Sequence, residues 1–161
     1  GSPMLFHCAC DHKNSWFEHL QQNGLTADSI GLEIGEGVLM DTSHDVSNTL
    51  FSFLDIGMPI MIDDFGTGCS SLTCLQKFHI DYLKIDQSFV GKLLDQSNEL
   101  MLCEAMIAMA HKLKIKVIAE GVETKDQYEL LKKMGCDYAQ GYLFSKPLSA
   151  GAFEALLAKS E

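Results

Sequence analysis

The chain has 161 residues, of which 47% are hydrophobic and 21% charged, and its formal net charge is −10. This length fits one compact domain, and the apolar content is sufficient for a buried core, which excludes a disordered chain. The acidic balance argues against binding of long nucleic acids, because a surface that follows their phosphates needs clustered lysine and arginine. A small phosphate ester stays compatible with this charge if a divalent cation bridges it to carboxylates.

The six cysteines show no spacing typical of a zinc site, and they stand singly among apolar residues except in Cys8-Ala9-Cys10. We therefore expect reduced, mostly buried thiols in a cytoplasmic protein. No apolar run approaches the roughly 18 residues of a membrane span, and no signal peptide precedes them. The sequence predicts no direct membrane contact from this chain, and leaves open that other domains of a parent protein anchor it to a membrane.

The N-terminal part is the least informative. Residues 1–13 show no clear pattern, and Gly1-Ser2-Pro3 is either an expression scar or native sequence that starts midway through a domain. Residues 14–23 are predicted to form a helix with Trp16, Phe17 and Leu20 on its apolar side. From residue 29 onward, short β-branched runs alternate with longer amphipathic stretches, which is typical of a parallel βα sheet.

Three βα units are predicted between residues 29 and 113. Their strands are expected at residues 29–34, 59–64 and 82–86, and their helices at residues 42–56, 71–78 and 98–113. Gly57 ends the first of these helices, and Ser97 suits the N-cap of the third.

Two further units follow. A strand is predicted at residues 116–120, and Thr124 with Gln127 fits the capping box of the next helix. The last unit combines a strand at residues 138–143 with a helix at residues 149–159. Repeated units of this length are typical of either a doubly wound sheet or a TIM-type barrel. A barrel needs eight strands, so as a barrel this chain is incomplete.

Polar residues stand at the carboxyl end of every predicted strand. They are Glu33, Asp63, Asp64, Lys84, Glu120 and Gln140. In parallel α/β folds these strand ends share one rim, where ligands bind. The sequence therefore predicts an acidic cup that contains one lysine and one glutamine.

Each of these carboxylates alone is commonly a helix cap or a solvated loop residue. A cluster differs, because closely packed carboxylates raise one another's pKa and cost stability unless a cation neutralises them. Oxygen ligands suit Mg²⁺ or Mn²⁺, and a pair such as Asp63-Asp64 can bridge two ions in sites that hydrolyse phosphate esters. Lys84 would then orient or polarise the attacking water, or stabilise the developing charge.

Five segments resemble the signature blocks of EAL domains in order and spacing: Leu32–Glu36, Asp63–Leu72, Leu83–Asp86, Ala119–Thr124 and Gln140–Tyr142. The match runs from about Trp16 to the C-terminus. The resemblance implies a modified TIM barrel. In active members this domain linearises the bacterial second messenger cyclic di-GMP to pGpG with two Mg²⁺ or Mn²⁺ ions.

The resemblance also implies the metal ligands. By motif, Glu33 and Asp63 bind the first ion, while Asp63, Asp64 and Glu120 bind the second, so that Asp63 bridges the two.

Catalytic and supporting roles are implied in the same way. The expected catalytic residues are Lys84, Glu120 and Gln140, with Lys84 contacting the nucleophilic water and Gln140 supporting that water or the substrate. The residues expected to support the metal ligands and to form the glycine loop beside them are Glu36, Glu123, Gly66, Thr67 and Gly68.

The chain departs from the family pattern at three points. Gly35 replaces the threonine of the Leu-Glu-Ile-Thr-Glu block, and Cys69 replaces the usual tyrosine after the glycine loop. The Glu-Ala-Leu strand, whose glutamate is a metal ligand, is absent, and the chain is expected to begin about two residues after an asparagine ligand. We therefore expect one truncated EAL domain over residues 1–161, a partial barrel that lacks its N-terminal strands, with residues 14–161 forming the βα units.

Three interpretations remain open at this stage. The parent protein is a cyclic-di-GMP phosphodiesterase, or it is a catalytically inactive receptor or interaction module for cyclic di-GMP, or this fragment alone does neither. We favour the phosphodiesterase, with weak or no activity of the isolated fragment. Open strand edges invite pairing with another chain, so we also expect a homodimer, with exchanged elements as one form of it.

Overall fold

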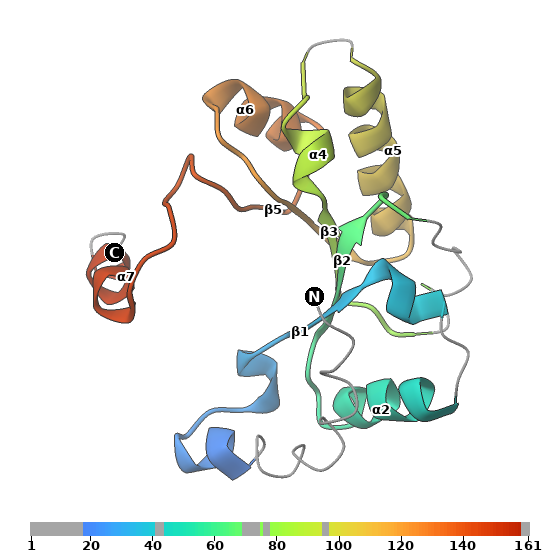
Figure 1. Cartoon of the computed structure of the whole chain (residues 1–161), viewed down its shortest axis with the longest axis vertical. Coiled ribbons are helices and arrows are strands. Elements are labelled where there is room, and N and C mark those ends of the chain that lie inside the picture. Colours follow the sequence, from blue (N-terminus) through green and yellow to red (C-terminus); the bar gives the residue numbers. More distant parts are fainter. Residues whose placement is uncertain (1–17, 41–43, 69–74, 76–77, 95–96, 159–161) are drawn as a thin grey trace.

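The computed structural model describes residues 18–40, 44–68, 75, 78–94 and 97–158. This part of the chain contains one parallel sheet of five strands in the order β1-β2-β3-β4-β5 (Figure 1). The strands are β1 (Leu32–Gly35), β2 (Ile60–Phe65), β3 (Tyr82–Ile85), β4 (Lys116–Ala119) and β5 (Tyr138–Ala139). Each strand pairs in parallel with the next along the chain, so every connection is a crossover, as in βα units.

The connections carry the helices. They are the 3-10 turns η1 (Ala27–Ser29) and η2 (Glu36–Met40) and the helices α2 (His44–Leu54), α4 (Gln87–Val90), α5 (Asn98–Lys112), α6 (Lys125–Lys133) and α7 (Ala150–Leu157). Two helices begin at the N-caps that the sequence predicts. The Ser97 hydroxyl accepts the Leu100 N–H at 3.0 Å, and Thr124 and Gln127 form a capping box.

The sheet separates an apolar face from a polar one. Ile60 and Ile62 on β2, and Leu83 and Ile85 on β3, are fully buried against the helices. Because side chains alternate along a strand, the residues between them point to the opposite face. Lys84 is one of these, so the packing of the helices fixes which residues face the polar side.

Three details differ from the sequence prediction. The first strand starts at Leu32 rather than Ser29, because residues 27–29 form a 3-10 turn. The fifth strand ends at Ala139, since the N–H groups of Phe144 and Ser145 bond to the Gly141 carbonyl and turn the chain away. Helix α4 was not predicted. Its four residues are too few to show helical periodicity.

Some predicted elements lie partly outside the described residues. Residues 18–22 are helical, as expected, while Trp16 and Phe17 lie outside. Most of the helix predicted at residues 71–78 also lies outside, although residue 75 is helical.

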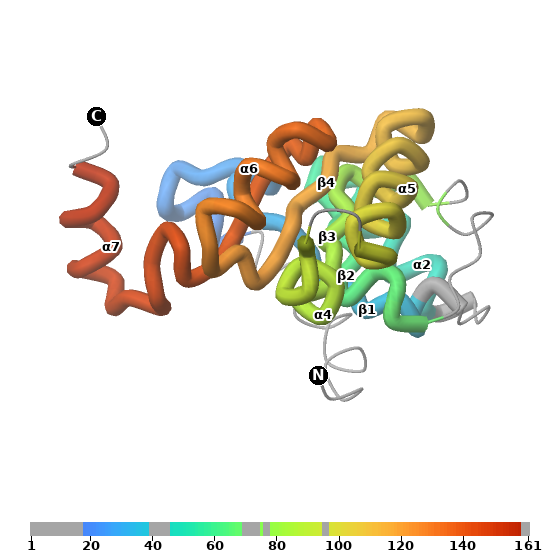
Figure 2. The backbone as a smooth tube through the Cα atoms, turned by 90° about the horizontal axis from the view of Figure 1, so that it is seen from above, coloured from blue at the N-terminus to red at the C-terminus, as the bar shows by residue number. Residues whose placement is uncertain are grey.

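The two ends of the sheet are strands β1 and β5, each with one paired neighbour among the described residues. Helix α7 carries no buried residue and lies at the far end of the molecule from α2 and α5 (Figure 1, Figure 2). Within the described part, no helix is long and apolar enough to cross a membrane.

Candidate metal centre

The buried ammonium group of Lys84 lies at the centre of an acidic cluster. Its Nζ atom is 3.0 Å from Glu33 Oε1, 3.0 Å from Asp63 Oδ1 and 2.7 Å from Glu120 Oε1. These carboxylates belong to β1, β2 and the residue that follows β4, and Lys84 itself belongs to β3. One cation therefore joins four neighbouring strands at the carboxyl end of the sheet.

The surroundings of Lys84 keep it charged. Burial by itself lowers the pKa of a lysine, because a medium of low polarity disfavours the charged form. The contacts with Glu120, Glu33 and Asp63 outweigh this effect and raise the pKa of Lys84 above its ordinary value. With 5% of its surface exposed, Lys84 acts as a fixed cation in the cluster.

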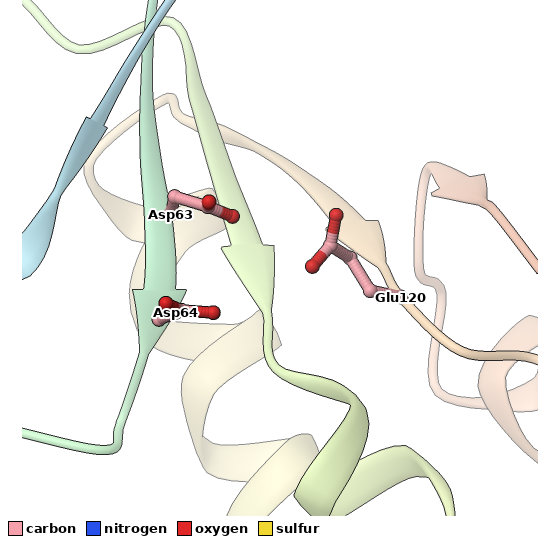
Figure 3. Close-up of side chains that lie close together, drawn as sticks. All are labelled: Asp63, Asp64 and Glu120. Atoms are coloured by element: carbon pink, nitrogen blue, oxygen red, sulfur yellow. The ribbon is translucent and has the colours of Figure 1, made fainter. Parts of the chain in front are cut away.

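A backbone irregularity brings the two consecutive aspartates to the same side. Neighbouring side chains of a strand normally point to opposite faces. Asp64 has a φ of 54°, in the left-handed region that few residues other than glycine adopt. The β2–β3 pairing also shifts between Ile62 and Phe65, which places a β-bulge at the pair. As a result, Asp63 and Asp64 both point toward Glu120 (Figure 3).

Three carboxylates form a compact oxygen cluster. Ligand oxygens of Asp63, Asp64 and Glu120 lie within 4.8 Å of one another (Figure 3). Asp63 Oδ1 is buried and accepts no well-directed hydrogen bond, although Lys84 Nζ is nearby. The charge of Asp63, burial and the charge of Asp86 raise the pKa of Asp64. Such a donor set fits a hard divalent cation, which would relieve the repulsion and use the unsatisfied oxygen.

Asp86 is a member of the site to which the sequence interpretation gave no role. It follows β3, its charge contributes to the raised pKa of Asp64, and its Oδ1 accepts the Ser88 N–H at 2.9 Å. The hydrogen bonds from Ser88 lower the pKa of Asp86. The available signal was its place at the end of a strand, which it shares with the other polar residues.

Glu36 holds the backbone of the glycine loop. Its Oε2 accepts the N–H groups of Gly66 at 3.2 Å and Gly68 at 3.1 Å. The Thr67 hydroxyl donates to the Asp64 carbonyl at 2.9 Å and closes the loop on itself. Gly66 has a φ of 96°, which favours glycine, and a Cβ at Gly68 would lie only 3.1 Å from the Glu36 carboxylate, so the loop packs tightly against Glu36.

Two predicted site residues, Gln140 and Glu123, have exposed side chains. Gln140 follows β5, and its backbone bonds to Ala119 and Val122, while its side chain is exposed. Glu123 is also exposed, and its N–H donates to Gln127 Oε1 at 2.9 Å as part of the α6 cap. Among the described residues, neither side chain forms a hydrogen bond or an ion pair with the acidic cluster.

A family model, the EAL domain, matches residues 8–147. The chain belongs to the EAL domain family. It is 42% identical over 138 residues to the cyclic di-GMP phosphodiesterase NbdA of Pseudomonas aeruginosa. The aligned region covers 86% of this chain and 18% of NbdA. The chain thus spans less than a fifth of this relative's length.

Solved structures agree with this EAL assignment. The EAL domain of Mycobacterium smegmatis DcpA is 38% identical with a TM-score of 0.82, covering 91% of this chain and 66% of that one. Klebsiella pneumoniae BlrP1, solved as a manganese and cyclic di-GMP complex, is 30% identical with a TM-score of 0.77, covering 85% of this chain and 35% of that one. These similarities confirm the predicted α/β fold of the EAL type, present here as five parallel strands.

Proposed function

We propose that this EAL domain is the catalytic part of a metal-dependent phosphodiesterase that hydrolyses cyclic di-GMP to linear pGpG. The observation that carries the proposal is the convergence of carboxylates from neighbouring strands on the buried ammonium group of Lys84. The similarity to the phosphodiesterase NbdA and to the cyclic di-GMP complex of BlrP1 supports the same substrate.

Charge supports two divalent ions. When all are ionised, the five carboxylates around Lys84 leave four negative charges after the lysine has neutralised one, which equals the charge of two divalent cations. The proposed ligands are Glu33, Asp63, Asp64 and Glu120. When bound, Mg²⁺ or Mn²⁺ would supply positive charge to the phosphodiester and favour deprotonation of a water molecule.

The protein residues supply position and charge. Lys84 is held by three ion pairs and cannot swing away, so it can orient the attacking water and stabilise negative charge on the phosphate. Glu36 keeps the glycine loop close to the aspartate pair through Gly66 and Gly68. We propose that Gln140 supports the water or the substrate, a role that requires its exposed side chain to turn toward the cluster.

The isolated 161-residue chain is proposed to be weakly active or inactive. It covers 66% of the solved DcpA chain, and the Glu33 side chain is 52% exposed at the open β1 end of the sheet. An exposed ligand is less well oriented than a buried one, which lowers metal affinity. We further propose a homodimer, to which the open sheet ends contribute.

The experiment measures pGpG by chromatography after incubation of cyclic di-GMP with Mn²⁺. It compares this chain with a longer protein that restores the rest of the domain. We expect turnover by the longer protein, loss of at least about 100-fold in Glu120→Ala, and little change in the exposed control Glu154→Ala. Saturable binding of cyclic di-GMP without turnover by the longer protein would contradict the enzyme and favour the receptor.

A further inference from the structure

The short helix α4 begins next to the strand ends that carry Asp64, on β2, and Glu120, after β4. It follows β3, the strand between β2 and β4, and it is joined to β3 only by Asp86. Asp86 caps it through the Ser88 N–H, and Val90 is fully buried. Helix α4 is therefore a fixed element that can contact the segments leaving β2 and β4.

On the β2 side, the contact is made by Phe89. A Cβ atom built on Gly66 would lie 3.1 Å from Phe89 Cε2 and 3.2 Å from Met106 Sδ, so the ring lies directly on this glycine backbone. Gly66 has a φ of 96° and stands two residues after Asp64. The ring thus restricts movement of the backbone that follows Asp64.

On the β4 side, the contact is made by Gln87. A Cβ atom on Gly121 would lie 2.5 Å from Gln87 Cβ and 3.3 Å from Gln87 Cα. Gly121 directly follows Glu120, whose N–H donates to the Ile85 carbonyl at 3.0 Å. The end of β4 is therefore held both by β3 and by the first residue of α4.

We propose that α4 sets the distance between the Asp64 and Glu120 carboxylates, with Phe89 and Gln87 as its positioning residues. Each acts through the backbone of a glycine that follows the carboxylate it positions, and among the described residues neither side chain has a polar contact with the cluster. The part of this inference that concerns metal affinity rests on the proposed function. The part that concerns backbone position does not.

The first test removes the Phe89 ring in the 161-residue chain. Mn²⁺ affinity is measured by the electron paramagnetic resonance signal of free Mn²⁺, and amide hydrogen exchange is measured for residues 64–68 without metal. We expect Phe89→Ala to weaken Mn²⁺ binding about tenfold and to speed this exchange, while Phe89→Leu stays close to the parent. The half-exposed ring of Phe51 on α2, changed to alanine, is the control and leaves both readouts unchanged.

The second test uses the close approach of Gly121 and Gln87. Gly121→Ala is expected to weaken Mn²⁺ binding and to speed amide hydrogen exchange in residues 119–123. Adding Gln87→Gly removes the Cβ atom with which the new side chain clashes, so the double variant should recover most of the Mn²⁺ affinity and most of the protection from exchange. Gly135→Ala controls for backbone strain, because Gly135 has a φ of 82° but nothing within 4 Å of its added Cβ. A general loss of stability would affect Gly135→Ala as well and would not respond to Gln87→Gly.

The outcomes separate the two proposals. The role of α4 would be overturned if folded Phe89→Ala had the same hydrogen exchange and Mn²⁺ affinity as the unsubstituted 161-residue chain. It would also be overturned if Gly121→Ala with Gln87→Gly showed no recovery. Absence of Mn²⁺ binding both in this chain and in the longer protein that restores the rest of the domain would instead contradict the metal site of the proposed function, and the exchange measurements would still decide whether α4 positions the strand ends.

Discussion

At the scale of single residues, Lys84 is the centre of the acidic cluster. It is a buried cation with three carboxylate partners, and removing one member of a buried ion pair leaves uncompensated charge. The sequence predicted that Lys84 lies at the polar end of a strand, because it interrupts an apolar run. Its three partners were not predicted, because strand register is a tertiary property.

Replacement of Lys84 by methionine tests this compensation. Without divalent cations, Lys84→Met is expected to lower the free energy of unfolding by about 3 kcal/mol, because three carboxylates lose their counter-charge. Chemical denaturation at low ionic strength in the presence of a chelator measures the loss, and added salt should reduce it. The exposed Lys112→Met serves as the control, with a change of less than about 0.5 kcal/mol. If Lys84→Met had the same free energy of unfolding as the unsubstituted chain, the cluster would need no internal cation.

Asp137 gives a pH-dependent prediction. Its Oδ2 accepts hydrogen bonds from His111 Nε2 and from the Val117 N–H, both at 2.8 Å. Burial raises the pKa of Asp137, but these hydrogen bonds outweigh it, so the pKa is lowered in the folded state. The resulting stabilisation is complete above the unfolded pKa of about 4 and is lost as the pH falls through the lower folded value.

Asp137→Asn is therefore expected to lower the free energy of unfolding by about 1 kcal/mol at pH 7. The difference from the parent should shrink below about pH 4 and vanish once Asp137 is protonated in the folded parent. Denaturation curves between pH 7 and pH 2 measure it, with the exposed Asp55→Asn as control. A difference that stays constant over this range would rule out the ionised carboxylate as its cause.

At the scale of elements, local signals predicted the helices better than the strand ends. The N-caps Ser97 and Thr124 act within four residues, so their helices begin as predicted. The bulge at Asp63-Asp64 depends on the pairing with the neighbouring strand, and the early end of β5 follows from the turn at Gly141. The convergence of the polar strand ends was predictable from topology alone.

Gly141 is required by a close backbone contact after β5. A Cβ at this position would overlap the backbone carbonyl oxygen and nitrogen of Val122, and backbone atoms cannot rotate away as side chains do. Gly141→Ala is expected to cost about 2 kcal/mol of unfolding free energy, measured by chemical denaturation. Gly151→Ala is the control, because it lies in α7 with open space around it and alanine favours a helix. Equal stability of the two variants would contradict the close contact.

At the scale of the whole molecule, the sheet is open and one helix stands apart from it. Large hydrophobic side chains are exposed along the C-terminal segment at Tyr142, Phe144, Leu148, Phe153 and Leu157. A surface of this kind favours association, while the net charge of −10 opposes it. The parallel sheet and the partial barrel were predicted from the sequence. The position of α7 was not, since its apolar pattern is typical of a packed helix.

Self-association is expected to depend on α7 and on salt. Analytical ultracentrifugation should show a larger mass as ionic strength rises, because salt screens the repulsion between negative chains. Phe153→Lys should shift the mass toward the monomer. Leu25→Lys introduces the same charge at another exposed hydrophobic residue, far from α7 in the sequence, and should leave the mass unchanged. A monomeric parent at high concentration and high salt would contradict the predicted homodimer.

The contacts of Lys84 also bear on how the protein is made in the cell. Some small metal-binding domains, such as zinc fingers, fold only when the metal arrives, because metal binding supplies their folding free energy. Here a residue of the chain itself neutralises part of the cluster, so we expect the polypeptide to fold before the proposed ions bind. On the proposed function, metal supply would then control activity without controlling the survival of newly synthesised protein.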